Sequence, residues 1–341
     1  MIDQTEIYHG GALDLAITEY GGQVNDWLDL STGINPYHYP TDRVSALSWT
    51  QLPQKTALNE LLMAASAAYN CPKKQIFAAN GTQYLIEILP KILPKSTIAI
   101  LAPTYQEHAY NWQKQGHNVI LVDNVEQAKQ ADHLIIVNPN NPTGKLLTPQ
   151  QLQMLHKHFA AKGGYLIIDE AFMDMTPDMS MAAHAGLDGL IILRSFGKFF
   201  GLAGVRVGFI LADDQILHKL EQHIGLWSIS GMAIELATCA LNDQKWQRDT
   251  RQTLAADMRD MCQILQQNQF EIIGQTDLFC LAKMPDGAAS AHKYFTKLAR
   301  QHILTRKFID DATILRFGLA KRQQQNDFAT KLNRICEAHT A

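Results

Sequence analysis

One lysine of this chain lies among glycines and aromatic residues, in a setting that favours covalent chemistry. Lys198 occurs in the segment RSFGKFFGLAGVRVG (residues 194–208), directly after an apolar run, and Arg206 follows eight residues later. Burial and a neighbouring cation both lower the pKa of a lysine, and the neutral amine is a nucleophile. Surface lysines rarely have such apolar neighbours, so we predict that Lys198 reacts with a carbonyl group.

An acidic residue ends another apolar run. Asp169 closes the run that begins at residue 165 and opens the string DEAF. A carboxylate in such a place is costly to bury unless it has a partner. The partner could be a structural salt bridge or a cationic ring nitrogen of a bound group, and the residues alone leave both open.

Two glycine-containing turns complete the set. The string NGTQ (residues 80–83) precedes an expected helix, where free N–H groups and the positive end of the helix dipole can bind a phosphate. A plain turn with Thr82 as the helix cap is the alternative. The string NPNNPTG (residues 138–144) predicts a rigid loop at a strand end, the edge at which open α/β sheets bind ligands.

These motifs need a sheet to bring them together, and seven short apolar runs predict one. Most are apolar throughout, as strands are when helices cover both faces of a parallel sheet. Helical stretches alternate with them, which predicts an α/β fold with a mostly parallel seven-stranded sheet. The runs lie at residues 75–80, 97–103, 117–123, 133–138, 165–170, 190–196 and 205–212.

The pattern changes after about residue 213. A long helical stretch at 246–267 is followed by short strands near 270–273, 278–282 and 313–317 and a last helix near 327–339, an α+β pattern. The Gly- and Pro-containing first 40 residues do not fit the sheet either. We therefore expect a large domain of residues 41–225 and a small domain of residues 1–40 and 226–341.

Bulk composition excludes several classes of protein. The 341 residues are 46% hydrophobic and carry a net charge of −3, so no broad attraction to nucleic acid or anionic lipid is expected. No apolar stretch is long enough for a membrane helix, and no signal peptide is visible. The five cysteines form no CxxC pair, which favours a cytoplasmic chain with reduced thiols. No metal site is expected, and the histidines other than His9 are interpreted as surface residues.

The ordered set NGT, NPNNPTG, DEAF and SFGK…R resembles the fold-type I enzymes that use pyridoxal 5′-phosphate (PLP), the aspartate aminotransferase superfamily. Within it the chain is most similar to the histidinol-phosphate aminotransferase branch, over about residues 8–320. The resemblance implies that Lys198 is the catalytic Schiff-base lysine and that Asp169 pairs with the pyridine nitrogen. It further implies that Asn141 binds O3′ and that Tyr105 stacks on the ring. Four other residues would hold the cofactor phosphate: Gly81, Thr82, Ser195 and Arg206.

Three positions depart from the aminotransferase pattern. Phe172 stands where a tyrosine usually donates a hydrogen bond to O3′. Gly197 stands where serine or threonine is common, which would shift phosphate binding onto Ser195 and Arg206. Leu52 replaces a tyrosine that would reach the cofactor of a neighbouring subunit.

The N-terminal strings HGG (residues 9–11) and WLDLSTGINP (residues 27–36) are more similar to the threonine-phosphate decarboxylases of cobalamin biosynthesis. These enzymes convert L-threonine O-3-phosphate, a phosphorylated amino acid, to (R)-1-amino-2-propanol O-2-phosphate. The resemblance implies a homodimer and a substrate clamp in which Arg316 binds the carboxylate. The other candidates for the clamp are His9, Ser31, Thr32 and Asn35.

Two other functions remain open at this point. A histidinol-phosphate or related aminotransferase would use the same lysine, acid and loops, because these motifs do not distinguish the two reactions. A non-catalytic regulator with an aminotransferase-like domain would be expected to carry an added DNA-binding domain, which is not visible in this sequence.

Overall fold

The computed structural model describes residues 10–287 and 290–337. Their contacts divide the chain into two compact units: unit 1 spans residues 38–141 and 145–246, and unit 2 holds residues 142–144 and the remaining described residues. Helix α11 (Gln244–Gln267) begins in unit 1 and continues into unit 2. This division differs from the expected boundary at residue 225, because α10 (Gly231–Asn242) packs against α3 (Lys55–Tyr69) within unit 1.

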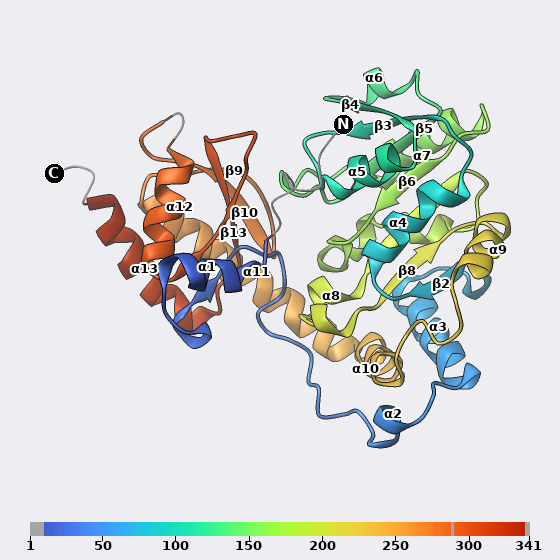
Figure 1. Ribbon diagram of the computed structural model, residues 1–341, viewed down its shortest axis with the longest axis horizontal. Coiled ribbons are helices and arrows are strands. Elements are labelled where there is room, and N and C mark those ends of the chain that lie inside the picture. Colours follow the sequence, from blue (N-terminus) through green and yellow to red (C-terminus); the bar gives the residue numbers. More distant parts are fainter. Residues whose placement is uncertain (1–9, 288–289, 338–341) are drawn as a thin grey trace. The chain divides into compact units, whose positions relative to one another are not determined.

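Unit 1 is built on a seven-stranded sheet, and all seven predicted strands are present (Figure 1). The order across the sheet is β2-β8-β7-β6-β5-β3-β4, and only β8 runs antiparallel to its neighbours. The α/β fold class is therefore confirmed. The strands are β2 (Ile76–Ala79), β3 (Thr97–Leu101), β4 (Asn118–Val122), β5 (His133–Val137), β6 (Leu166–Asp169), β7 (Leu190–Ser195) and β8 (Gly208–Leu211).

Helices cover the sheet and explain why its strands are apolar throughout. Every residue of β5 and β6 is buried. On one face, α4, α5 and α9 form a single hydrophobic core with the strands. The remaining bounds of unit 1 are α2 (Leu47–Thr50), α4 (Thr82–Ile92), α5 (Glu107–Lys114), α6 (Val125–Ala128), α7 (Pro149–Ala160), α8 (Phe196–Phe199) and α9 (Asp214–His223).

Unit 2 is an α+β unit, as its sequence pattern predicts. A four-stranded antiparallel sheet has the order β12-β13-β10-β9, and the short strands β1 and β11 pair in parallel. Its strands are β1 (Leu28–Asp29), β9 (Glu271–Thr276), β10 (Phe279–Lys283), β11 (Ile303–Leu304), β12 (Arg306–Lys307) and β13 (Ile314–Gly318). Its other helices are α1 (Leu13–Tyr20), α12 (Ala291–Arg300) and α13 (Arg322–Glu337).

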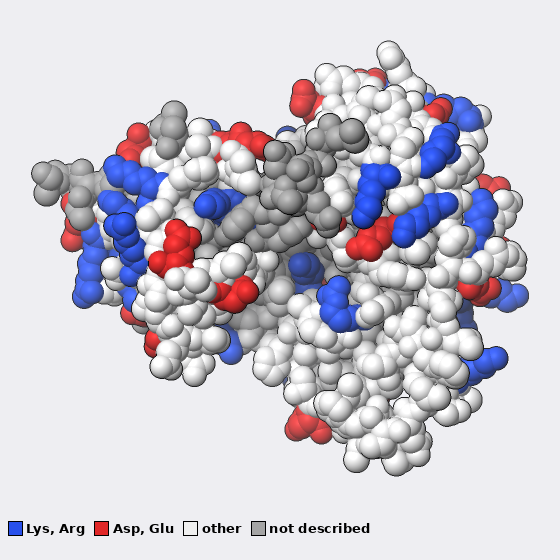
Figure 2. Space-filling view, viewed as in Figure 1, with Lys and Arg blue, Asp and Glu red and all other residues white. Residues whose placement is uncertain are grey.

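The surface of unit 1 is mixed in charge. On the face shown in Figure 2, acidic and basic side chains are interspersed over the upper part, and the region over α2 and α10 carries few of either. Within residues 10–287 and 290–337, no helix has the length and apolar character needed to cross a membrane.

Candidate active site

One cavity of unit 1 is lined by all eight residues that the sequence singles out for cofactor binding. Its volume of about 190 Å³ is more than ten times the roughly 15 Å³ that one water molecule needs. Its walls come from the carboxyl ends of the strands and the loops that follow them, because parallel strands present those ends along one edge of a sheet. The eight residues are Gly81, Thr82, Tyr105, Asn141, Asp169, Ser195, Lys198 and Arg206.

One end of the cavity has the features of a phosphate site. Helix α4 begins at Thr82, so its free backbone N–H groups and positive dipole end lie in the cavity wall. Gly81 has a φ of 84°, and a Cβ atom there would lie 2.7 Å from the Arg206 guanidinium. A Cβ atom at Gly208 would lie 2.4 Å from the Thr82 nitrogen. The positive φ favours glycine at position 81, and the close backbone contact requires glycine at position 208.

Close packing explains why position 197, which departs from the aminotransferase pattern, is glycine. A Cβ atom at Gly197 would lie 2.9 Å from the Cα atom of Ala203, so a serine or threonine does not fit this turn. Ser195, two residues earlier, lies at the end of β7 and lines the cavity with a half-buried side chain.

Asp169 has a partner that the sequence analysis missed. Its carboxylate lies 2.9 Å from Nε2 of His108, and both side chains are buried. The backbone N–H of Ala171 donates a second hydrogen bond to the same carboxylate. The pair holds the carboxylate in one orientation at the cavity wall. No sequence signal connects two residues 61 positions apart, and only the adjacency of α5 to the sheet reveals the pair.

The interpretation of the histidines as surface residues was wrong for four of them. His108, His117, His133 and His156 are buried. His117 and His156 each bond a backbone carbonyl through Nε2. Short polar–apolar patterns do not show which histidines a neighbouring element covers. In the folded chain His108 bonds a carboxylate, and the other three bond backbone groups.

Lys198 is half-buried and lines the cavity. It lies in the short helix α8, which directly follows β7. Its Nζ lies 5.8 Å from the centroid of the Phe172 ring. Phe172 is buried and lines the same wall. The residue that replaces the usual tyrosine thus places an aromatic face, without a hydroxyl group, next to the lysine.

The loops that carry Tyr105 and Asn141 are tied to each other. Thr104 Oγ1 donates to Asn140 Oδ1 at 2.7 Å, and Asn140 Nδ2 donates to the backbone oxygen of Pro103 at 2.9 Å. Asn140 therefore fixes the relative position of the two loops. This also fixes the cavity residues that the loops carry, Tyr105 and Asn141.

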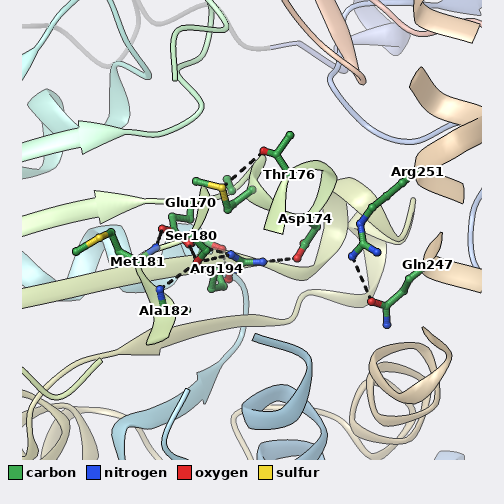
Figure 3. A network of polar contacts seen from close by, with 12 residues as sticks. Glu170, Asp174, Thr176, Ser180, Met181, Ala182, Arg194, Gln247 and Arg251 are labelled. Atoms are coloured by element: carbon green, nitrogen blue, oxygen red, sulfur yellow. Dashed lines mark hydrogen bonds and ion pairs between the residues drawn. The ribbon is translucent and has the colours of Figure 1, made fainter. Parts of the chain in front are cut away.

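A buried ionic network lies next to Asp169 and Ser195 in the chain (Figure 3). Arg194 Nη1 lies 2.8 Å from the carboxylate of Glu170, and Nη2 contacts Asp174. The guanidinium also lies over the ring of Tyr69, 4.2 Å from its centroid. Burial alone would lower the pKa of Arg194, but Asp174 and Glu170 raise it above its ordinary value. The network joins the ends of β6 and β7, which carry the acid and the lysine turn.

Replacing Arg194 with methionine is expected to lower the free energy of unfolding by about 3–5 kcal/mol, because two carboxylates would remain buried without their cation. Urea denaturation measures the change. Arg334→Met, at an exposed position on α13, is the control and should leave stability nearly unchanged. Equal stability of Arg194→Met and wild type would contradict this assignment.

The structure also brings together part of the predicted substrate clamp, in unit 2. Arg316 is buried on β13, and its Nη2 donates to the backbone oxygen of Ser31 at 2.7 Å. The Ser31 hydroxyl donates to Asp29 and accepts from the N–H of Gly11. Arg306, which the sequence analysis missed, lies directly opposite Arg316 on β12. Burial and then the charge of Arg306 lower the pKa of Arg316 well below its ordinary value.

The other clamp candidates lie in different settings. The backbone oxygen of Thr32 would lie 2.2 Å from a Cβ atom at Gly318, so Thr32 packs closely against β13. Asn35 is buried and its Oδ1 accepts a hydrogen bond from the N–H of Tyr37. His9 lies outside the described residues.

Relatives of the chain have been named for both of the reactions considered above. It is 39% identical over 314 residues to the threonine-phosphate decarboxylase of Pseudomonas aeruginosa, covering 91% of this chain and 92% of the relative. The enzyme of the same name from a Sinorhizobium species is 38% identical and covers 92% and 93%. A histidinol-phosphate aminotransferase of Mesorhizobium japonicum is 25% identical and covers 93% and 91%.

Solved structures share the fold. L-threonine-O-3-phosphate decarboxylase from Porphyromonas gingivalis aligns with a TM-score of 0.77 at 18% identity, over 90% of this chain and 99% of that one. Histidinol-phosphate aminotransferase from Sinorhizobium meliloti, solved in complex with pyridoxal 5′-phosphate, aligns with a TM-score of 0.84 at 15% identity, over 98% and 96%. Residues 26–327 match the model of the family described as aminotransferase class I and II, and the chain belongs to that family.

Proposed function

We propose that the protein is a PLP-dependent decarboxylase that converts L-threonine O-3-phosphate to (R)-1-amino-2-propanol O-2-phosphate, for cobalamin biosynthesis. The observation that carries the choice of reaction is 39% identity with a threonine-phosphate decarboxylase along nearly the whole chain, against 25% with a histidinol-phosphate aminotransferase. In the overall reaction the Cα–carboxylate bond breaks, CO₂ leaves, and a proton takes its place on Cα.

The residues lining the cavity fit PLP. The Arg206 guanidinium, the N–H groups at the start of α4 and the Ser195 hydroxyl line the cavity and form a donor set that suits a phosphate. Asp169 would pair with the ring nitrogen, Asn141 would bind O3′, and Tyr105 would stack on the ring. When bound, the cofactor supplies a covalent link to the substrate amine and withdraws electrons from Cα.

The protein's own groups then set the course of the reaction. Lys198 Nζ is the nucleophile of the site and the proton source for Cα after CO₂ leaves. Asp169, held by His108, presents its carboxylate at a fixed point of a largely buried wall. A substrate held at its carboxylate and phosphate has its Cα–carboxylate bond aimed for cleavage, which is an effect of orientation.

We assign the anionic groups of the substrate to the arginines of unit 2. Two arginines directly opposite each other on paired strands repel one another. A bound carboxylate or phosphate relieves this repulsion, and arginine binds both in a bidentate manner. Ser31, Thr32, Asn35 and His9 remain proposed members of this clamp.

The arginine pair predicts stabilisation by an anion that carries both a carboxylate and a phosphate but lacks an amine. Phospho-L-lactate is such a compound, one carbon shorter than the substrate. At about 100 times its Kd it should add about 2.7 kcal/mol to the stability of the cofactor-free protein. Thermal unfolding with and without the ligand measures this effect. Arg316→Met should lose the ligand-induced rise in Tm, whereas Arg334→Met should keep it; an equal rise in both would exclude Arg316 as the anion site.

Product analysis tests the proposed reaction. The PLP-loaded protein is incubated with L-threonine O-3-phosphate, and CO₂ and aminopropanol phosphate are quantified. Stoichiometric release of both supports decarboxylation. Formation of pyridoxamine phosphate with a keto acid, and no CO₂, would show an aminotransferase instead. L-histidinol phosphate with 2-oxoglutarate serves as the comparison substrate pair.

We further propose a homodimer formed through the surface of α2 and the loop before α10. Leu47, Trp49 and Leu52 are 61%, 69% and 60% exposed, and Leu226 and Trp227 are 78% and 59% exposed. The first residue of α10 packs closely against α2, since a Cβ atom at Gly231 would lie only 2.9 Å from the backbone oxygen of Ser48. Exposed apolar groups of this size mark protein interfaces. Light scattering should show a dimer in the wild type and a monomer in Trp49→Glu; a monomeric, fully active wild type would contradict the proposal.

The cytoplasm is the proposed location. All five cysteines lie in the described part of the chain, and none forms a disulfide there, as expected in a reducing compartment.

A further inference from the structure

A chain of polar side chains lies behind Tyr105 and ends at a buried carboxylate. Tyr105 Oη donates to Gln83 Oε1 at 3.1 Å. Gln83 Nε2 donates to Glu107 Oε2 at 2.8 Å and to Glu87 Oε1 at 3.3 Å. Tyr105 and Gln83 line the cavity, whereas Glu107 is 5% exposed and is not among its lining residues. None of the roles proposed above uses Gln83 or Glu107.

The direction of these hydrogen bonds follows from the chemistry of the groups. An ionised carboxylate only accepts hydrogen bonds. The two carboxylates beside Gln83 therefore require its NH₂ group on their side, and its carbonyl oxygen must face Tyr105. Because that oxygen can only accept, the Tyr105 hydroxyl must donate its proton to Gln83.

Glu107 is itself held in place. Asn111 Nδ2 donates to Glu107 Oε2 at 3.0 Å and to the Glu107 backbone oxygen at 2.8 Å, and both residues are buried on α5. Gln83 belongs to the first turn of α4, which packs against α5. The hydrogen bonds thus connect the two helices to the loop that carries Tyr105. They end at Glu107, which is buried and held by Asn111.

The same segment also carries the histidine that bonds Asp169. The ring of His108 lies edge-on to the ring of Tyr105, with centroids 6.1 Å apart and an interplanar angle of 85°. His108 in turn bonds Asp169. A shift of the Tyr105 ring would therefore be transmitted to the histidine that orients the acid.

We propose that Gln83 and Glu107 are positioning residues that fix the ring of Tyr105 and keep its hydroxyl proton bonded to the protein. The proton of this hydroxyl is then withheld from the reacting centre, which leaves proton delivery to Lys198. Gln83 acts only through Tyr105. The orientation of the ring does not depend on the reaction, but its consequence for proton delivery rests on the proposed decarboxylase function.

The test combines a double-mutant cycle with a readout on the cofactor-free protein. Gln83→Met keeps the size of the side chain and removes all three hydrogen bonds; Gln83→Leu is the second variant, in case the first does not fold. The ¹³Cζ resonance of Tyr105 in tyrosine-labelled apo-protein is identified by its loss in Tyr105→Phe. It should shift in either Gln83 variant and stay in place in Gln222→Leu, a control at an exposed position on α9.

The cycle then measures the PLP dissociation constant by fluorescence quenching. Gln83→Met and Tyr105→Phe should each weaken PLP binding by about tenfold, the size of one lost hydrogen bond. The double variant should be no weaker than Tyr105→Phe alone, because Gln83 acts through the hydroxyl. An unmoved Tyr105 resonance, or additive losses, would overturn the proposal. Neither readout uses the substrate, so failure of the decarboxylase assignment would leave this result intact.

Discussion

Replacing Lys198 with alanine should abolish turnover, with a loss of roughly 10⁴-fold or more, because no other group of the site can take the roles of nucleophile and proton donor. The visible absorbance of PLP bound through a lysine should disappear as well, since alanine carries no amine. Spectra and single-turnover assays on the PLP-loaded protein measure the two effects. PLP should still bind, because Gly81, Thr82, Ser195 and Arg206 remain to hold its phosphate.

The matched control is Lys157→Ala, at an exposed position on α7, which should keep both the absorbance and the activity. Absorbance that persists in Lys198→Ala would show that PLP is linked to another lysine. Loss of absorbance with full activity would show that the covalent link is not needed, and would contradict the assignment of Lys198.

Asp169→Asn is expected to lower kcat by about 10³-fold, the size seen when one preorganised electrostatic partner of a reacting group is removed. Asparagine has nearly the same shape and can still accept the hydrogen bond from Ala171, so the fold and the outline of the cavity should survive. It carries no charge, however, and cannot hold a protonated ring nitrogen. The carboxylate is only 3% exposed, so water cannot replace it.

Steady-state kinetics measure this effect, with Asp178→Asn at an exposed position as the control. His108→Phe should give a smaller loss, about tenfold, because the carboxylate stays and loses only one hydrogen bond. An Asp169→Asn enzyme with wild-type kcat would show that the carboxylate has only a structural role, the alternative that the sequence left open.

The strands of unit 1 were predictable because burial on both faces leaves a clear trace in a sequence. The stretches at residues 134–137 and 166–168 are apolar throughout, and they form most of β5 and β6. The site residues were predictable for a related reason. Gly81, Asp169 and Ser195 end or follow an apolar run, and the strand order brings these carboxyl ends to one edge, where the three residues line one cavity.

The unit boundary could not be read from composition. The chain becomes helical after residue 213, and the sequence pattern alone assigns everything from residue 226 onward to the smaller domain. Helix α10 nevertheless lies in unit 1, because its buried side chains pack on α3, some 170 residues earlier in the chain. A helical pattern shows that an apolar face exists but not which surface covers it.

The sequence alone was sufficient to propose Lys198, Asp169, Asn141 and Arg206 as site residues, because motif spacing and strand burial are local properties of the chain. Tertiary structure decided what these residues contact. It placed His108 against Asp169, Arg306 opposite Arg316, and Gln83 between Tyr105 and Glu107. Each of these pairs joins different elements, and a hydrogen bond or ion pair between elements depends on packing distances that no local pattern encodes.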